Sequence, residues 1–375
     1  MPLAPARQGV SDGFHIYPIV MEEGTLGNPE TIVWASIRHL CSREVAEGIA
    51  APLHGITTKK DKRAIGRNLK LYIRHASEFY EAAGAAKANT APLIYYYSFL
   101  NLAKALCELR SPEFHKRSEC YKHGVSWRPD PQRVADPAKE TVSITTRGVW
   151  HVLWEALTQK PCPATNPTKL GIKKLFSYCP EVSVESDQTL GTALRMLDVE
   201  APDVLWDTGS REVWLRLSFG RSELKAFRVS APALIKQIRT PRSGYTEVKS
   251  KDRRFRTFQS ASPKKLARGE LPRFGIASDI AALNLFTHLG PDRTLEYYLP
   301  LQARLPFPLP QLMINYTILF WLGSLVRYDP HSVDRLMDSG YWMLIDGFMS
   351  QSRLWLLELF EWAFYRAETT LLISR

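Results

Sequence analysis

APLIYYYSFLNLAKALCELR, residues 91–110, is the longest apolar run with helical spacing in the chain. Pro92 suits a first helical turn, because the N–H group that proline lacks would have no intrahelical partner there. Apolar residues cover most of the circumference, which is typical of a helix buried in a core. Polar residues recur on one face at steps of four, three and four residues: Tyr97, Asn101, Lys104 and Glu108. The stretch therefore predicts a core helix that carries a polar stripe.

Helical spacing of apolar residues recurs in both terminal thirds of the chain, with β-type alternation between them. TVSITT at 141–146 predicts a strand, while VWLRLSF at 213–219 and LKAFRVS at 224–230 predict a hairpin. The predicted fold class is mainly α (α+β), with a helical core from the N- and C-terminal thirds and a small antiparallel β-containing insertion. Further helices are predicted over residues 29–50, 61–84, 147–159, 169–178, 311–327, 331–339, 341–349 and 353–370.

The order of these elements predicts four parts. Residues 1–28 are expected to form an N-terminal arm with a short extended piece at 14–20. Residues 29–135 and 291–375 are the first and second parts of the helical core, and residues 136–290 are an α/β insertion. The helices that contain LNLAKAL and LGSLVRY are predicted to pack together, so that one domain forms from distant parts of the sequence.

The composition excludes several classes of protein. Apolar residues make up 45% and charged residues 23% of the 375 residues, as in an ordinary globular protein. The five cysteines form no CxxC pair, so neither a disulfide framework nor a metal site is indicated, and no Walker A, GxGxxG, GxSxG or HExxH motif occurs. The N-terminus lacks the apolar region of a signal peptide, and no apolar run reaches 18 residues. We therefore expect a cytoplasmic protein without a cofactor and without a membrane contact.

Positive charge is concentrated in residues 221–273, which we call the basic segment. It has 15 Lys and Arg residues against four acids, an excess of +11 that equals the formal net charge of the whole chain. Such a concentration favours a polyanionic partner, and Phe255 and Phe258 among the cations suit base stacking. The alternative is a solvated surface loop, since residues 231–275 are expected to form a long, partly mobile connection. The predicted nucleic-acid-binding residues are Lys249, Lys251, Arg253, Arg254, Arg256, Lys264, Lys265 and Arg268.

Several pieces of the sequence resemble the YaaC-like family of bacterial proteins. The resemblance covers the chain from about residue 30 onward, and it implies kinship without assigning an activity. The segment 236–273 matches nothing in that family and is expected to be particular to this chain. The pieces that resemble the family are YIRHASEFYEAA at 72–83, PLIYYYSFLNLAKAL at 92–106, HGVS at 123–126, VSITTRGVWHVLWEAL at 142–157 and YTILFWLGSLVRYDP at 316–330.

The polar stripe could serve either the fold or a ligand. A lysine on a core-facing helix needs an acid, a carbonyl or a ligand anion, because burial of an unpaired charge is costly. In one interpretation Lys104 pairs with Glu108, one turn further on, within a structural network. In the other, cations gather around a pocket for an anion such as a nucleotide or an RNA phosphate. The predicted pocket residues are Arg74, His75, Asn101, Lys104, His123 and Arg327.

Arg110 and His115 have the R-x4-H spacing of HEPN-type ribonucleases. The resemblance implies that the two side chains act on the scissile phosphate and the 2′-hydroxyl of RNA, and histidine suits acid–base work near neutral pH. Pro112 interrupts the helix that usually displays this motif, and a chain with this many arginines and histidines contains about one such match by chance.

Three functions follow as hypotheses. The leading one is a cytoplasmic nucleic-acid-associated or partner-binding protein, a subunit of a bacterial defence or genome-maintenance complex, that binds DNA or RNA through the basic segment. The first alternative is a HEPN-like, metal-independent ribonuclease. The second is a structural scaffold without nucleic-acid contact. A protein partner subunit or a homo-oligomer is expected, because many Trp and Tyr residues lie in the C-terminal helices and an exposed share of them would form an interface.

Overall fold

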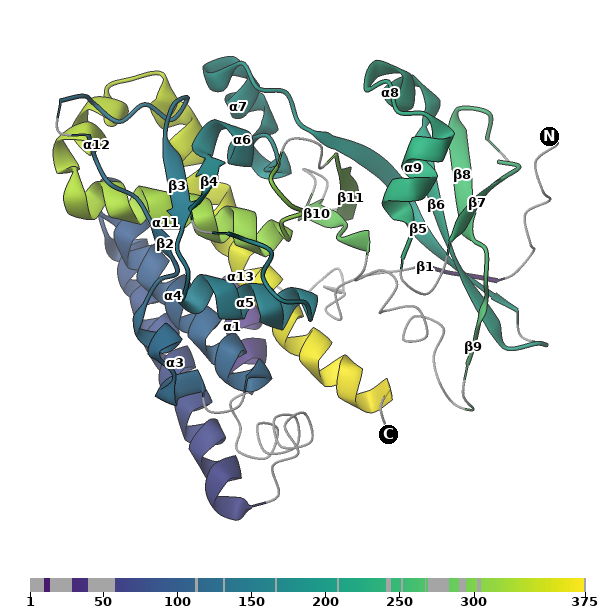
Figure 1. Cartoon of the computed structure of the whole chain (residues 1–375), viewed down its shortest axis with the longest axis horizontal. Helices are drawn as coiled ribbons and strands as arrows, with labels where there is room; N and C mark the ends of the chain where they lie inside the picture. The colour runs from purple at the N-terminus through teal and green to yellow at the C-terminus, as the bar shows by residue number, and fades with distance from the viewer. Residues whose placement is uncertain are drawn as a thin grey trace. The chain divides into compact units, whose positions relative to one another are not determined.

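The computed structural model divides the chain into two compact units. The strand-rich unit contains residues 1–22 and 195–301, and the helical unit contains residues 23–194 and 302–375. Figure 1 shows the elements of both. The structure describes residues 10–13, 29–39, 58–111, 114–130, 132–165, 167–207, 209–240, 244–250, 252–266, 268, 283–289, 295–301 and 305–373.

Helices dominate the described part of the helical unit, with a small antiparallel sheet of order β2-β3-β4 beside them. The strands are β2 (Val125–Ser126), β3 (Thr141–Ile144) and β4 (Thr168–Gly171). The α-helices are α1 (Pro29–His39), α3 (Lys59–Ala85), α4 (Ala91–Arg110), α5 (Val149–Thr158), α6 (Ile172–Phe176), α7 (Ser183–Leu190), α11 (Gln311–Tyr328), α12 (Pro330–Met337) and α13 (Tyr341–Ile373). Short 3-10 helices are η1 (Phe114–Lys116), η2 (Ser118–Tyr121) and η3 (Pro180–Val182).

Helix α4 is the centre of the helical unit and contacts α3, α5, α11 and α13. Its bounds match the predicted core helix, with Pro92 in the first turn. It forms a hairpin with α3, in which the buried Ser98 hydroxyl donates to the Ala76 carbonyl at 2.7 Å. Tyr80 of α3 packs edge-on against Tyr95 of α4. The apolar circumference of α4 is thus covered by other helices, as its sequence requires.

Helices α4 and α11 lie in direct contact, which confirms the predicted packing of LNLAKAL against LGSLVRY. Gly323 makes the close approach possible: a Cβ atom there would lie 3.1 Å from the Tyr96 Cβ and 3.5 Å from the Leu93 Cα. The Tyr96 ring also meets the Tyr316 and Phe320 rings of α11. Two segments more than 200 residues apart therefore share one core.

The strand-rich unit is built on an antiparallel sheet that has eight strands among the described residues. The order is β10-β11-β5-β6-β8-β7, with β1 also pairing with β5 and β9 with β6. Apolar side chains of β6 and β8, including Phe219 and Phe258, form a core with Leu234 and Ile238 of helix α9. The strands are β1 (Val10–Gly13), β5 (Met196–Asp207), β6 (Glu212–Gly220), β7 (Tyr245–Val248), β8 (Phe255–Ser260), β9 (Lys264–Lys265), β10 (Phe286–Leu289) and β11 (Leu295–Pro300), and the helices are α8 (Arg221–Ala226) and α9 (Ala231–Ile238).

The observed fold class is α+β with antiparallel sheets, which confirms the predicted fold class in these two respects. The unit boundaries differ from the predicted ones. Residues 136–194, expected in the insertion, belong to the helical unit, and the strand-rich unit begins at residue 195 and takes in residues 1–22. The reason is packing: helix α5 contacts α4, and helix α6 contacts α11.

Two local predictions were wrong. LKAFRVS at 224–230 is the end of helix α8 followed by a turn, in which Arg228 has a φ of 55°. Strand β6 instead pairs with β5, the strand that directly precedes it, and with β8, which a more distant segment contributes. The predicted helix 169–178 begins as strand β4, because Thr168–Gly171 completes the small sheet before α6 starts.

The predicted mobile connection at 231–275 was also wrong where the structure describes it. Helix α9 and strands β7, β8 and β9 occupy much of this range. Their runs of apolar residues are short and are interrupted by charged residues. The alternation of apolar and polar residues that indicates a strand is therefore weak in this part of the sequence.

The predicted helices 341–349 and 353–370 form one continuous helix, α13. Helix α1 is described to His39, and the rest of the predicted helix 29–50 lies outside the described residues, as does the extended piece at 14–20. In the described part of the chain, no helix combines the length and the apolar character that a membrane crossing requires.

Candidate anion and nucleic-acid sites

Glu108, at the end of the polar stripe, is completely buried on α4. Its carboxylate accepts hydrogen bonds from the Asn68 side-chain amide at 3.0 Å, the His115 backbone N–H at 2.9 Å and His115 Nδ1 at 2.8 Å. The pairing of Lys104 with Glu108, one of the two interpretations of the stripe, is thus not found among the described residues. Three donors satisfy the buried acid instead, as a buried charge requires.

The positive charges of Lys104 and Arg327 both act on His123, and neither cation forms an ion pair among the described residues. Arg327, near the end of α11, donates from Nη1 to the Tyr97 hydroxyl at 3.1 Å. Asn101 donates to the Tyr97 carbonyl at 2.8 Å. Of the six residues predicted for the anion pocket, the structure thus brings Lys104 and Arg327 into the surroundings of His123, and Asn101 lies on α4 between Tyr97 and Lys104.

The hydroxyl oxygen of Tyr96, on α4, lies 2.6 Å from Nδ1 of His123. Burial is the main cause that lowers the pKa of His123, and the positive charges of Lys104 and Arg327 lower it further. Burial, more than any other cause, also raises the pKa of Tyr96 well above its usual value, so the hydroxyl keeps its proton. Because its pKa is lowered, His123 is a neutral imidazole near pH 7, and its tautomer decides whether Nδ1 or the Tyr96 hydroxyl is the donor.

The other two predicted pocket residues are not joined to this cluster in the described structure. Arg74 is exposed on α3 and faces Glu78 one turn on, with 3.8 Å between Nε and Oε1. His75 is half-buried on the same helix.

Arg110 and His115 have different environments. Arg110 ends α4, and its Nε is buried without a hydrogen-bond partner among the described residues. Burial lowers the pKa of Arg110 to about 10, so the guanidinium stays charged at neutral pH. His115 lies in η1 with 28% of its side chain exposed and is oriented by Glu108 rather than by Arg110.

A pocket of about 300 Å³ lies between the α3–α4 turn and α13. Small residues such as Ala83 and Gly84 line it, together with Tyr95 and Arg353. The Arg353 guanidinium donates to the Tyr95 hydroxyl at 3.2 Å and pairs with Glu30 at 3.1 Å. None of the residues predicted for a site lines this pocket.

The basic segment is split between two ends of strand β6. Val213, near the start of β6, pairs with Lys264, and Gly220, at its end, pairs with Phe255. At about 3.3 Å per residue these pairs lie about 23 Å apart along the strand. Lys264, Lys265 and Arg268 therefore belong to one end of the sheet, and the β7–β8 turn with Lys249, Arg253 and Arg254 belongs to the other.

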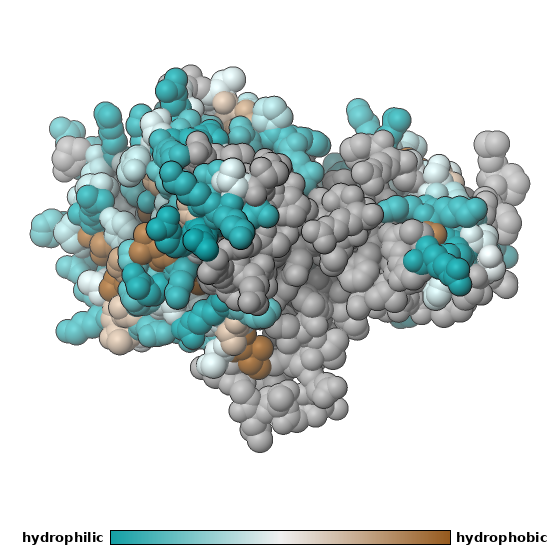
Figure 2. Space-filling view, turned by 90° about the horizontal axis from the view of Figure 1, so that it is seen from below, coloured by the Kyte–Doolittle hydropathy of each residue, from teal (hydrophilic) through white to brown (hydrophobic). Residues whose placement is uncertain are grey.

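The β6 end that carries the β7–β8 turn gathers further cations, which the sequence spacing does not reveal. The Arg221 backbone N–H donates to the Arg254 carbonyl at 2.9 Å, which joins the start of α8 to the start of β8. We call this surface the basic end, and every one of its five members is exposed: Arg221, Lys225, Lys249, Arg253 and Arg254. On the face drawn in Figure 2, hydrophilic residues make up most of the coloured surface.

Two arginines of the predicted set already have acidic partners. Arg256 forms a two-fold hydrogen-bonded pair with Glu247 across β7 and β8, at 2.7 and 2.6 Å. Arg254 binds Asp252 in the turn at 2.7 Å and remains 82% exposed. Lys251 lies outside the described residues. Arg256 is thus part of the sheet, whereas Arg254 still presents its charge to solvent.

A family model described as YaaC-like Protein matches residues 54–361. The chain belongs to the YaaC-like family. The match spans α3 through most of α13, and it confirms the resemblance carried by the α3, α4 and α11 sequences. The matched range also includes residues 236–273, which were expected to be particular to this chain. No curated protein and no solved structure shows significant similarity to this YaaC-like protein.

Proposed function

We propose that this YaaC-like protein binds a nucleic acid, DNA or RNA, through the basic end of its strand-rich unit. The observation that carries the proposal is the gathering of five exposed cations at one end of the sheet. They come from α8, from the β7–β8 turn and from the residue that precedes β8, so cross-strand pairing brings them together.

Among the described residues, the acids near the basic end form an ion pair with only one of its five cations, Arg254, on which the charge of Glu200 in β5 also acts. Asp252 pairs with Arg254, and hydrogen bonds from Arg254 hold the pKa of Asp252 below its usual value. Glu223 of α8 is half-buried and accepts the Asp198 backbone N–H at 3.0 Å, so it is directed toward β5. Arg221, Lys225, Lys249 and Arg253 have no acidic partner among the described residues, and each can neutralise a phosphate.

An aromatic ring accompanies the cations. The Arg254 guanidinium lies 5.6 Å from the centre of the Phe255 ring, which is half-buried. Cations that follow a backbone beside an aromatic side chain are typical of single-strand binding, where bases stack and phosphates pair. A single-stranded ligand is therefore the first one to test.

The test is fluorescence anisotropy with labelled single-stranded RNA, single-stranded DNA and duplex DNA of equal length. Lys249→Gln/Arg253→Gln should weaken binding at least tenfold, because two charge-assisted phosphate contacts are lost. Lys59→Gln/Lys60→Gln is the matched control: it removes the same charge from exposed residues in the first turn of α3. Equal loss in both variants would show that net charge, and not the basic end, drives binding.

The wider setting belongs to the same proposal. We propose a cytoplasmic protein that acts with a partner subunit, or as a homo-oligomer, in a bacterial defence or genome-maintenance complex. Kinship with a bacterial family and the concentrated charge support it. A scaffold without nucleic-acid contact is the alternative that the binding experiment would favour if the wild type bound none of the three ligands.

A second candidate is a metal-independent, HEPN-like ribonuclease, favoured by the contact between Glu108 and His115. Because the buried carboxylate accepts the Nδ1 proton, His115 Nε2 carries a lone pair and can act as a general base. Arg110, two residues from Glu108, supplies a cation for a phosphate. Wild type, His115→Ala and Glu108→Gln should be compared on single-stranded RNA in the presence of EDTA. Absence of cleavage by the wild type would exclude this candidate.

A further inference from the structure

The α4–α11 crossing in the helical unit gathers hydrogen-bond donors without an acid to receive them. Lys104 and Arg327 come from helices separated by more than 200 residues, and neither forms an ion pair among the described residues. Both charges act on His123, and like charges close to one another lower stability unless an anion lies between them. Arg327 donates one N–H to the Tyr97 hydroxyl, and the other N–H groups of its guanidinium remain available to a ligand.

His123 and Tyr97 add neutral donors. The Tyr96 hydroxyl lies 2.6 Å from His123 Nδ1, and when Tyr96 is the donor of this bond the ring's proton lies on Nε2. The Tyr97 hydroxyl accepts from Arg327, which leaves its own proton to donate. An ammonium, a guanidinium, an imidazole N–H and a phenol thus stand in one neighbourhood. This set of donors matches the oxygens of a phosphate group.

The loop that carries His123 is rigid. Gly124 has a φ of +83° and Gly148 a φ of +147°, and a Cβ on Gly148 would lie 2.2 Å from the Gly124 nitrogen. The backbone N–H of Trp150 donates to the His123 carbonyl at 3.0 Å. The imidazole is therefore held in place before any ligand arrives, which lowers the entropic cost of binding.

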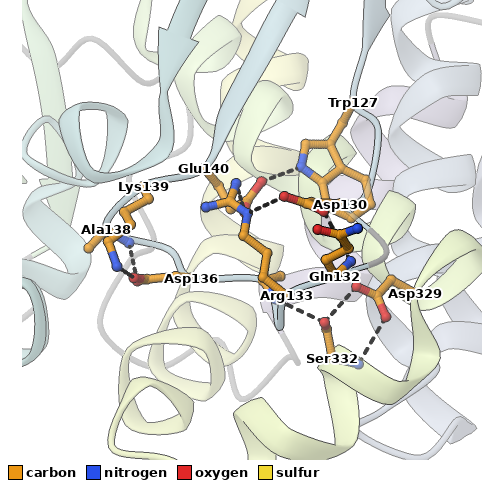
Figure 3. A network of polar contacts seen from close by, with 11 residues as sticks. Trp127, Asp130, Gln132, Arg133, Asp136, Ala138, Lys139, Glu140, Asp329 and Ser332 are labelled. Atoms are coloured by element: carbon orange, nitrogen blue, oxygen red, sulfur yellow. Dashed lines mark hydrogen bonds and ion pairs between the residues drawn. The ribbon is translucent and has the colours of Figure 1, made fainter.

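A second network fixes the end of α11 that carries Arg327 (Figure 3). Asp329, two residues after Arg327, accepts from the Ser332 backbone and hydroxyl at the start of α12. The Ser332 hydroxyl in turn accepts the Ala135 backbone N–H at 2.9 Å. Further along, the indole of Trp127 donates to Glu140 at 2.6 Å. The segment that follows His123 is thereby tied to the end of α11.

We propose that Lys104, Arg327, His123 and Tyr97 form a binding site for a phosphate monoester, such as the terminal phosphate of a nucleotide. The site is independent of the basic end, because all its residues belong to the helical unit. Arg74 and His75 are not part of it.

The experiment is isothermal titration calorimetry of the full chain with inorganic phosphate, AMP and adenosine. The wild type should bind phosphate and AMP, and it should not bind adenosine. Lys104→Gln and Arg327→Gln should each weaken AMP binding at least tenfold, because each removes a charge-assisted contact. Lys104→Arg should retain binding, since it keeps the charge. Circular dichroism of each variant verifies that it is folded.

Arg74→Gln is the matched control, because it removes one exposed cation from the neighbouring helix α3. It should bind AMP as the wild type does. The proposal is overturned if the wild type binds neither phosphate nor AMP, if adenosine binds as tightly as AMP, or if Lys104→Gln/Arg327→Gln binds AMP unchanged. Lys249→Gln/Arg253→Gln should leave AMP binding intact, so this site and the nucleic-acid site can fail separately.

Discussion

The carboxylate of Glu108 lies 2.8 Å from Nδ1 of His115, seven residues further along the chain. This contact turns the segment after α4 back onto the helix and leaves Lys104 without the acid one turn away. Two properties of the polar stripe follow from it: a satisfied buried acid at one end, and a cation, Lys104, without an ion pair among the described residues, whose charge acts on His123 as that of Arg327 does.

Glu108→Gln should destabilise the helical unit. A glutamine at this position places an N–H₂ group against donors from Asn68 and His115, and at least one buried donor then loses its acceptor. We expect a loss of about 2–4 kcal/mol in the free energy of unfolding, measured by urea denaturation followed by circular dichroism. Glu78→Gln is the control, because that acid is exposed and faces Arg74 at 3.8 Å. A similar effect of both changes would contradict a buried network at Glu108.

Gly323→Val should weaken the α4–α11 packing. The first added carbon would already lie 3.1 Å from the Tyr96 Cβ, and the two methyl groups of valine need more room than this contact leaves. We expect the free energy of unfolding to fall by about 1–3 kcal/mol or more, as in overpacked cores. Gly340→Val is the control, since a Cβ atom at Gly340 meets nothing within 4 Å. Unchanged stability of Gly323→Val would show that the helices do not cross at this position.

Stability should fall as pH rises through neutrality because of a buried acid on α13. Burial, more than any other cause, raises the pKa of Glu361 to about 7, and Glu361 is 4% exposed. A raised pKa means that the folded state favours the protonated acid, so this contribution to stability is complete below the usual value of about 4.5 and is lost as pH rises through about 7. Thermal melts from pH 5 to 8 should show this decline. Glu361→Gln should reduce this decline, to which Glu358 also contributes because burial and the charge of Glu361 raise its pKa to about 7, and an unaltered pH profile in that variant would contradict the assignment.

Arg256 and Arg253 should separate sheet stability from nucleic-acid affinity. Arg256 is 27% exposed and pairs with Glu247 through two hydrogen bonds, so Arg256→Gln should lower the free energy of unfolding by about 1 kcal/mol and leave nucleic-acid affinity within a factor of two. Arg253 is exposed, so Arg253→Gln should lower nucleic-acid affinity and leave the free energy of unfolding unchanged. Thermal melts and anisotropy on both variants measure it. If Arg256→Gln lost nucleic-acid affinity and Arg253→Gln did not, the binding surface would lie on the β7–β8 face and not at the basic end.

The helical part of the fold could be predicted because apolar spacing reports helices directly. Helix α4 has the bounds that its sequence indicates, and LGSLVRY contacts it as expected. The contact of Glu108 with His115 could not be predicted, since it depends on the backward turn through η1, which has no periodic signal. The pairing of Tyr96 with His123 depends likewise on a loop held by two glycines.

The basic segment shows a second limit of sequence reasoning. Its charge is evident from composition, but the division of that charge depends on the cross-strand register of β6 with β8 and β9. Because of this register, Arg221 lies beside the β7–β8 turn, whereas Lys264 lies at the other end of β6. No spacing in the sequence reports a pairing between segments more than 30 residues apart.

The most direct test of nucleic-acid binding is the salt dependence of affinity for single-stranded RNA and DNA. The logarithm of the association constant of the wild type should fall linearly with the logarithm of salt concentration, and Lys249→Gln/Arg253→Gln should reduce the magnitude of that slope by about 1 to 2, because two phosphate contacts are lost. Lys59→Gln/Lys60→Gln should keep the wild-type slope. A flat salt response of the wild type, or the same slope in Lys249→Gln/Arg253→Gln as in the wild type, would contradict binding through the basic end.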